Sequence, residues 1–194
     1  MNGTAHTALD SNTHNHARDL SNLLVGQHRI PVRQADKYDG AGEAESARST
    51  RRALFVDFDG VLHPTVLARF DEPPEPLATV FFGWLPALIE LLRKYPDVAI
   101  VVHSTWRYMH DVDELKLLLG ALGPQVVGAT PRGPRYESIE WWLQMNPSFA
   151  DHRILDDDAS EFPTPPPPEL ILCNPTTGVA ASDVLAALRA WLEG

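Results

Sequence analysis

The sequence predicts an α/β fold in which a parallel, Rossmann-like sheet lies between two layers of helices. Short apolar runs recur along the chain, and the segments between them read as helices. Strands that alternate with helices are typical of a parallel sheet covered on both faces. Acidic or hydroxyl side chains directly follow several of the runs, and this is the edge where such sheets hold their ligands.

The predicted elements all lie after residue 50. Apolar runs predict strands at residues 53–58, 98–103, 125–127, 152–155 and 169–173. Helices are predicted at residues 84–94, 111–119, 137–144 and 182–192. Asp111, with Glu114 three residues later, is the expected cap of the second helix, and Ser182 is the expected cap of the last.

Residues 1–50 differ in composition from the rest of the chain. They are rich in Asn, Ser, Thr, His and Asp and have no sustained apolar face. We expect them to form a disordered or loosely docked tail, and residues 51–194 to form one folded domain.

Composition narrows the class of protein. The net charge of −10 argues against a broad basic surface for a nucleic-acid backbone, although it leaves room for a basic pocket at a polymer end. Cys173 is the single cysteine, so a disulfide framework is excluded and a reducing compartment is favoured. The sequence shows neither a membrane-spanning stretch nor a secretion signal. We therefore expect a cytoplasmic protein.

The first apolar run leads directly into Asp57 and Asp59, and Gly60 follows. In extended backbone the two carboxylates point to the same side. Carboxylates this close repel unless a cation lies between them, and Mg²⁺ prefers oxygen ligands of this kind. The alternative is a strand that turns back at an Asp-Gly hairpin.

The second run ends in Ser104 and Thr105, with Arg107 close behind. Hydroxyl groups and a planar guanidinium suit phosphoryl oxygens. The alternative is a strand-to-helix turn in which a hydroxyl caps the helix and the arginine lies in solvent.

The fourth run leads into Asp156, Asp157 and Asp158. An isolated acidic triplet belongs to a solvated loop in most proteins. Here the triplet follows a strand, so a parallel sheet places it on the same edge as Asp57 and Ser104. Four or more carboxylates at one edge require a divalent cation.

Arg132 and Arg135 precede the predicted helix at residues 137–144. A cation at the start of a helix is unfavourable unless an anion also binds there. Arg135 is the first candidate for an anion-binding residue and Arg132 the second. The alternative is a pair of exposed loop arginines.

Together these residues resemble the haloacid-dehalogenase-like (HAD) phosphatase superfamily. Its first motif is matched by residues 57–62, its second by residues 101–104 and its acidic fourth motif by residues 155–157. Finer details are similar to the HAD domain of Swiss Army knife RNA-repair proteins. These details are His63-Pro64, Ser104–Arg107, Gly128–Pro131 and Asn174–Val179. An arginine stands where the superfamily usually has a lysine as its third motif.

The resemblance implies a Mg²⁺-dependent phosphatase. Asp57 would attack phosphorus and form an aspartyl-phosphate, while Asp59 would protonate the leaving oxygen and then activate water. Mg²⁺ would bind to Asp57, to Asp59 through its backbone carbonyl, and to Asp156 or Asp157. The residues expected to hold the phosphoryl oxygens are Ser104, Thr105, Arg107 and Arg135.

The substrate class stays open at this point. The segments between the predicted strands are too short for a large cap domain, and an open site favours a large substrate such as an RNA or DNA end. The acidic net charge points instead to nucleotides or other small molecules, with the proline-rich loop at residues 71–76 or a second subunit as a lid. A third alternative is a non-catalytic binding module that retains the fold.

Overall fold

The computed structural model describes residues 51–65 and 81–194, and it contains one sheet of five parallel strands in the order β3-β2-β1-β4-β5. The strands are β1 (Arg52–Val56), β2 (Ala99–Val102), β3 (Val126–Ala129), β4 (Asp151–Asp156) and β5 (Leu170–Leu172). The α-helices are α3 (Leu85–Leu92), α4 (Val112–Leu118), α5 (Arg135–Met145) and α6 (Ser182–Glu193). The predicted tail at residues 1–50 and the proline-rich loop at residues 71–76 lie outside the described residues.

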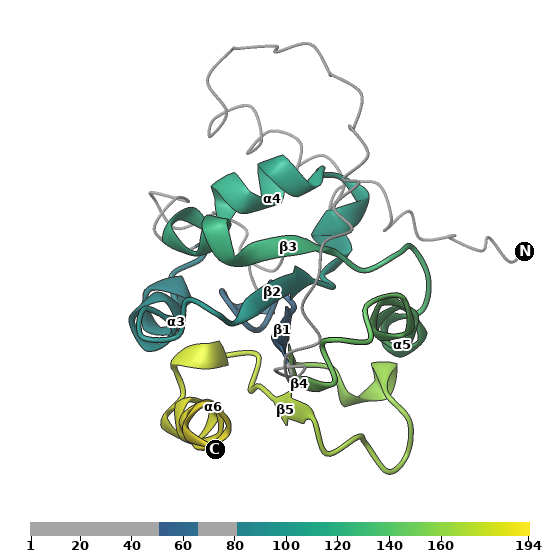
Figure 1. Cartoon of the computed structure of the whole chain (residues 1–194). Helices are drawn as coiled ribbons and strands as arrows, with labels where there is room; N and C mark the ends of the chain where they lie inside the picture. Colours follow the sequence, from purple (N-terminus) through teal and green to yellow (C-terminus); the bar gives the residue numbers. More distant parts are fainter. Residues whose placement is uncertain (1–50, 66–80) are drawn as a thin grey trace, which may run out of the picture. The chain divides into compact units, whose positions relative to one another are not determined.

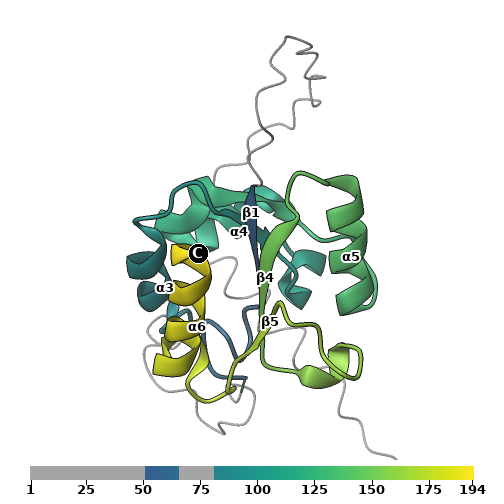
Figure 2. The ribbon, with the colours of Figure 1, turned by 60° about the horizontal axis from the view of Figure 1, so that its bottom comes forward.

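Helices cover both faces of this sheet, as predicted (Figures 1 and 2). Leu54 and Val56 of β1 pack in the core cluster that contains α3 and α6, whereas Phe55 packs in the cluster that contains α5. Residues 53–56 are fully buried because β1 is central and covered on both sides, which explains its unbroken apolar run. Burial of each of the Leu, Phe and Val side chains contributes about 1.5–3 kcal/mol to folding.

The order of the strands reverses direction between β1 and β4. The chain runs outward from β1 to β2 and β3, and then returns to place β4 on the other side of β1. The loops after β1 and β4 therefore leave the sheet in opposite directions, and ligands of open α/β sheets bind at such a point. Both neighbours of β1 are parallel to it, so the alternative of an Asp-Gly hairpin is wrong.

The helix boundaries follow local chemistry, with one correction. Asp111 caps α4 in a capping box with Glu114, as predicted. Ser182 is not a cap, because the carbonyl of Ala181 accepts the hydrogen bond from Leu185 and makes Ser182 the first helical residue. None of the helices among the described residues is long and apolar enough to cross a membrane.

Most other boundaries differ from the predictions by one or two residues, and two of these shifts have a local explanation. The third strand begins one residue later than expected, and the Gln125 side chain instead donates hydrogen bonds to the carbonyls of Tyr95 and Val98. Helix α5 begins at Arg135 rather than at residue 137, directly after Pro134. Within the described residues, no segment forms a large cap domain, and only residues 130–134 separate β3 from α5.

Candidate active site

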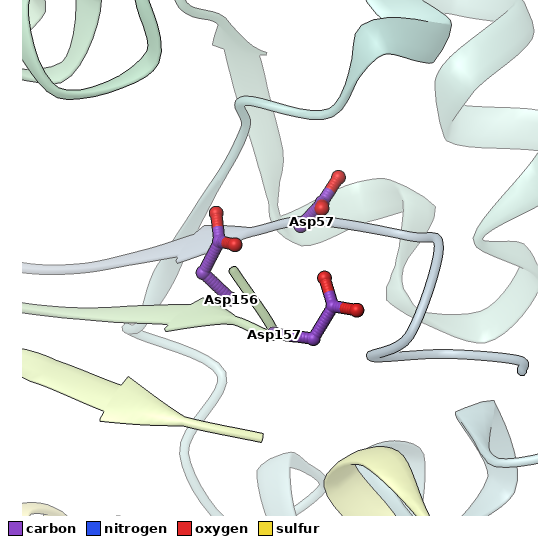
Figure 3. A group of neighbouring side chains, drawn as sticks. All are labelled: Asp57, Asp156 and Asp157. Atoms are coloured by element: carbon purple, nitrogen blue, oxygen red, sulfur yellow. The ribbon is translucent and has the colours of Figure 1, made fainter. Parts of the chain in front are cut away.

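Three aspartates converge at the carboxyl ends of β1 and β4 (Figure 3). Asp57 directly follows β1, Asp156 is the last residue of β4 and Asp157 comes next. One carboxylate oxygen from each residue lies within 4.8 Å of the other two. Asp57 and Asp156 are buried, and Asp157 is half-buried. A buried group of three hard oxygen donors fits a divalent cation such as Mg²⁺.

Arg135, the first residue of α5, lies among these carboxylates. Its Nη1 atom is 2.8 Å from Asp57 Oδ2 and 2.8 and 2.7 Å from the two carboxylate oxygens of Asp156. One guanidinium beside three carboxylates leaves the cluster acidic, so a divalent cation is still favoured. The other candidate, Arg132, is exposed and donates to the carbonyl of Tyr108 (3.1 Å).

The pKa values of the three carboxyl groups reflect this crowding. Burial raises the pKa of Asp57 to about 7, against the opposing effect of Arg135, and the charge of Asp156 adds to the increase. Burial also raises the pKa of Asp156 and that of Asp157. A bound divalent cation stabilises the ionised forms and therefore lowers these pKa values.

The side chain of Asp59 points to different partners. Its Oδ1 lies 3.0 Å from His63 Nε2, and its Oδ2 accepts a hydrogen bond of 3.0 Å from Trp106 Nε1. Burial acts to raise the pKa of Asp59. The hydrogen bond to His63, the charge of His63 and the hydrogen bond from Trp106 outweigh this effect, so the pKa of Asp59 is lowered. Asp59 is therefore held as a separate carboxylate beside the three-aspartate cluster.

The residues after β2 form the loop that borders the cluster. Ser104 is buried, and its Oγ accepts the N–H of Trp106 at 3.4 Å, so the hydroxyl acts as a cap of the short 3₁₀-helix Thr105–Tyr108. Thr105 is exposed. Arg107 is partly buried and donates to the carbonyls of His103 and Ser104. Among the described residues, no ion pair joins Arg107 to the three aspartates.

Three further residues make contacts at the site that were not predicted. Thr65 Oγ1 donates to Asp157 Oδ2 (3.0 Å), and Ser138 Oγ donates to the carbonyl of Arg135 (2.8 Å). The buried His103 places Nδ1 3.6 Å from Asp156 Oδ2 and Nε2 3.1 Å from the carbonyl of Leu155. Burial, together with the charge of Arg135, lowers the pKa of His103 to about 3. The one feature of the sequence that pointed to these contacts was His103, a histidine at the end of an otherwise apolar predicted strand.

A parallel Rossmann-like sheet with an Asp-x-Asp sequence after its first strand, and further aspartates after the adjacent strand, defines an HAD-like protein. The sequence matches the family described as the HAD domain in Swiss Army Knife RNA repair proteins over residues 53–184. This match spans more than half of the chain, and the protein belongs to that family. No curated protein and no solved structure matches the chain.

Proposed function

We propose that residues 51–194 form a Mg²⁺-dependent phosphatase that acts through an aspartyl-phosphate on phosphorylated nucleic-acid ends. The observation that carries this proposal is the convergence of Asp57, Asp156 and Asp157 with Arg135 at the carboxyl ends of β1 and β4. The proposal includes the cytoplasmic location expected from the single cysteine, which is free and buried.

Asp57 is the nucleophile in this proposal. One of its carboxylate oxygens forms a bond to phosphorus while the bond from phosphorus to the leaving oxygen breaks. The negative charge of the bound phosphoryl group favours the protonated form of Asp59, which donates its proton to that oxygen. In the second step Asp59 accepts a proton from water, which attacks the aspartyl-phosphate and releases inorganic phosphate and free Asp57. Mg²⁺, held by Asp57, the backbone carbonyl of Asp59, and Asp156 or Asp157, would offset carboxylate charge and bind a phosphoryl oxygen when present.

Arg135 is the proposed principal ligand of the phosphoryl group. Its Nη1 already lies 2.8 Å from Asp57 Oδ2, beside the attacking carboxylate. Negative charge spreads over the equatorial phosphoryl oxygens during the transfer, so a cation at this place stabilises the transition state. Ser104, Thr105 and Arg107, from the loop after β2, complete the proposed set of phosphate ligands.

A basic aromatic group beside the site supports a nucleic-acid end as the substrate. Arg107, Tyr108 and Arg132 form this group, which we call the Tyr108 cluster. The guanidinium carbons of the two arginines lie 4.5 and 5.3 Å from the centroid of the Tyr108 ring, which is exposed. Within residues 51–65 and 81–194, neither arginine has a carboxylate within ion-pair distance. Arginines beside an aromatic ring suit the sugar-phosphate backbone next to a terminal phosphate, and the family description names RNA repair.

The experiment measures Mg²⁺-dependent phosphate release by the full chain from end-phosphorylated RNA and DNA oligonucleotides, from mononucleotides and from an aryl phosphate. We expect higher kcat/KM with oligonucleotides, and we expect Asp57→Asn to reduce release from all substrates to background because the nucleophile is lost. Full activity of Asp57→Asn would remove the nucleophile assignment. A preference for mononucleotides would mean that the substrates are nucleotides rather than nucleic-acid ends. No release from any substrate would favour a non-catalytic binding module.

Arg132→Ala tests the role of the Tyr108 cluster. We expect KM for oligonucleotides to rise about three- to tenfold while KM for mononucleotides is unchanged, because the lost contact is to the backbone beyond the terminal phosphate. Arg189→Ala, which removes an exposed arginine from α6, is the matched control and should change neither value. Equal effects of the two substitutions would argue against a specific contact with the strand.

A further inference from the structure

We propose that His63 and Trp106 are positioning residues that hold the Asp59 carboxylate in the orientation required for proton transfer. The inference rests on the proposed function, in which Asp59 is the general acid and base. It adds two residues whose effect on catalysis is exerted through Asp59.

The two donors contact different oxygens of the same carboxylate. His63 Nε2 lies 3.0 Å from Oδ1, and Trp106 Nε1 donates to Oδ2 at 3.0 Å. Rotation of the carboxylate about its Cβ–Cγ bond therefore breaks at least one of the two hydrogen bonds. Each oxygen keeps a second lone pair, and 42% of the Asp59 side chain is exposed, so a site for the transferred proton remains open.

The first donor, His63, is itself held in place by packing and by a backbone hydrogen bond. The His63 side chain is fully buried, and its ring centroid lies 5.1 and 5.3 Å from those of Phe81 and Phe82. The carbonyl of His63 accepts the N–H of Gly60 at 2.7 Å, which closes the loop that carries Asp59. Packing and backbone contacts thus fix the ring that approaches Asp59.

Trp106 is held by a further set of contacts. Its ring stacks on His110, with centroids 5.5 Å apart and planes inclined by 24°. His110 Nδ1 lies 3.3 Å from Glu114 Oε2 in the first turn of α4. Donors whose rotamers are locked by packing orient a reacting group without further loss of entropy.

The chemistry of the His63 position argues against a purely structural role. Among the described residues, His63 Nδ1 is buried without a hydrogen-bond partner. An unpaired buried polar atom costs about 1–3 kcal/mol, and an apolar side chain of similar size would avoid this cost. The imidazole therefore contributes at this position through the bond from Nε2 to Asp59.

The test compares leaving groups. Protonation by a general acid matters greatly for an alkoxide and little for a nitrophenolate. For Trp106→Phe and His63→Leu we expect kcat to fall about tenfold or more with an alkyl phosphate, but less than about threefold with nitrophenyl phosphate. His63→Gln should recover most of the loss, since its side-chain amide can donate to Asp59 from a similar place.

Two further comparisons distinguish a loss of Asp59 positioning from general damage to the fold. Phe149→Leu removes a buried aromatic ring from the other core cluster, which contains neither His63 nor Trp106, and any loss should be equal for both substrates. In an Asp59→Asn background, measured with phenyl phosphate, Trp106→Phe should cause no further loss. Circular dichroism and thermal unfolding verify that each variant is folded. Trp106→Phe retains an aromatic ring at its position, and His63→Gln retains a polar donor.

Equal losses with both leaving groups, or an undiminished effect of Trp106→Phe in the Asp59→Asn background, would overturn the positioning role. Failure of the proposed function has a different signature, namely activity that survives Asp57→Asn or the absence of phosphate release from every substrate. The two outcomes are therefore distinguishable within one set of variants.

Discussion

Gly60 meets two constraints at once, one from its backbone and one from the site. Its φ of +71° lies in the left-handed region, where a side chain is unfavourable. A Cβ atom at this position would also collide with the Asp157 carboxylate and lie 2.7 Å from Thr65 Oγ1. The turn after β1 thus brings its backbone against one of the three clustered aspartates.

Gly60→Ala should lose about 1–2 kcal/mol of unfolding free energy through its backbone. It should also weaken Mg²⁺ or Mn²⁺ binding about tenfold or more, because Asp157 must move away from the cluster. Denaturant unfolding and titration calorimetry measure the two effects. Gly120→Ala is the control, since Gly120 has a φ of +53° and open space around its Cβ position. It should lose stability but keep its metal affinity, and equal metal affinities in the two variants would contradict the argument.

At the scale of the element, α4 shows how a local sequence signal supports the site from a distance. Asp111 Oδ1 accepts the N–H of Glu114 (2.9 Å), and Glu114 Oε2 accepts the N–H of Asp111 (3.1 Å). The same Glu114 side chain faces His110, which stacks on Trp106. The capping box therefore orders the first turn of α4 and the His110 ring that stacks on Trp106.

Asp111→Ala should cost about 1 kcal/mol of unfolding free energy, because the cap leaves an N–H of the first turn unsatisfied. The change is measured by urea unfolding at pH 7. Asp113→Ala removes a charge from the same turn without removing a cap, and should cost only about 0.3 kcal/mol. Equal losses would show that the charge of the turn, rather than the cap, stabilises α4.

For the whole molecule, the acidic cluster couples stability to pH and metal. The pKa of Asp57 is about 7 in the folded protein and near the ordinary value of 3.8 in the unfolded chain. Between these values the folded protein retains a proton that the unfolded chain has lost, so the free energy of unfolding falls as pH rises from about 4 to about 7. Below this window the effect is absent, and above it the loss is complete.

Asp57→Asn removes this dependence, because the amide stays neutral at every pH. Without metal, we expect the variant to be more stable than the original protein at pH 7.5, with the difference shrinking toward pH 4. Mg²⁺ should stabilise the original protein more than the variant at pH 7.5, because it binds the ionised cluster. Unfolding curves in chelator and in Mg²⁺ measure both effects, and parallel pH profiles of the two proteins would contradict this account.

The sequence by itself determined the parallel α/β fold, the approximate elements and the edge at which Asp57 and the Asp156–Asp158 triplet meet. These follow from apolar periodicity and from the rule that parallel strands share a carboxyl edge. The Asp111 cap could equally be predicted from the sequence, because a capping box lies within four consecutive residues.

Only the tertiary structure decided which side chains meet. It placed Arg135 rather than Arg132 on Asp57 and Asp156, and it left Asp158 to accept the N–H of Ser160 while Asp157 joined the cluster. It also brought Trp106, which is 47 residues away in sequence, to Asp59. The physical reason is that strand order and rotamers set these contacts, and neither is encoded in the local spacing of residues along the chain.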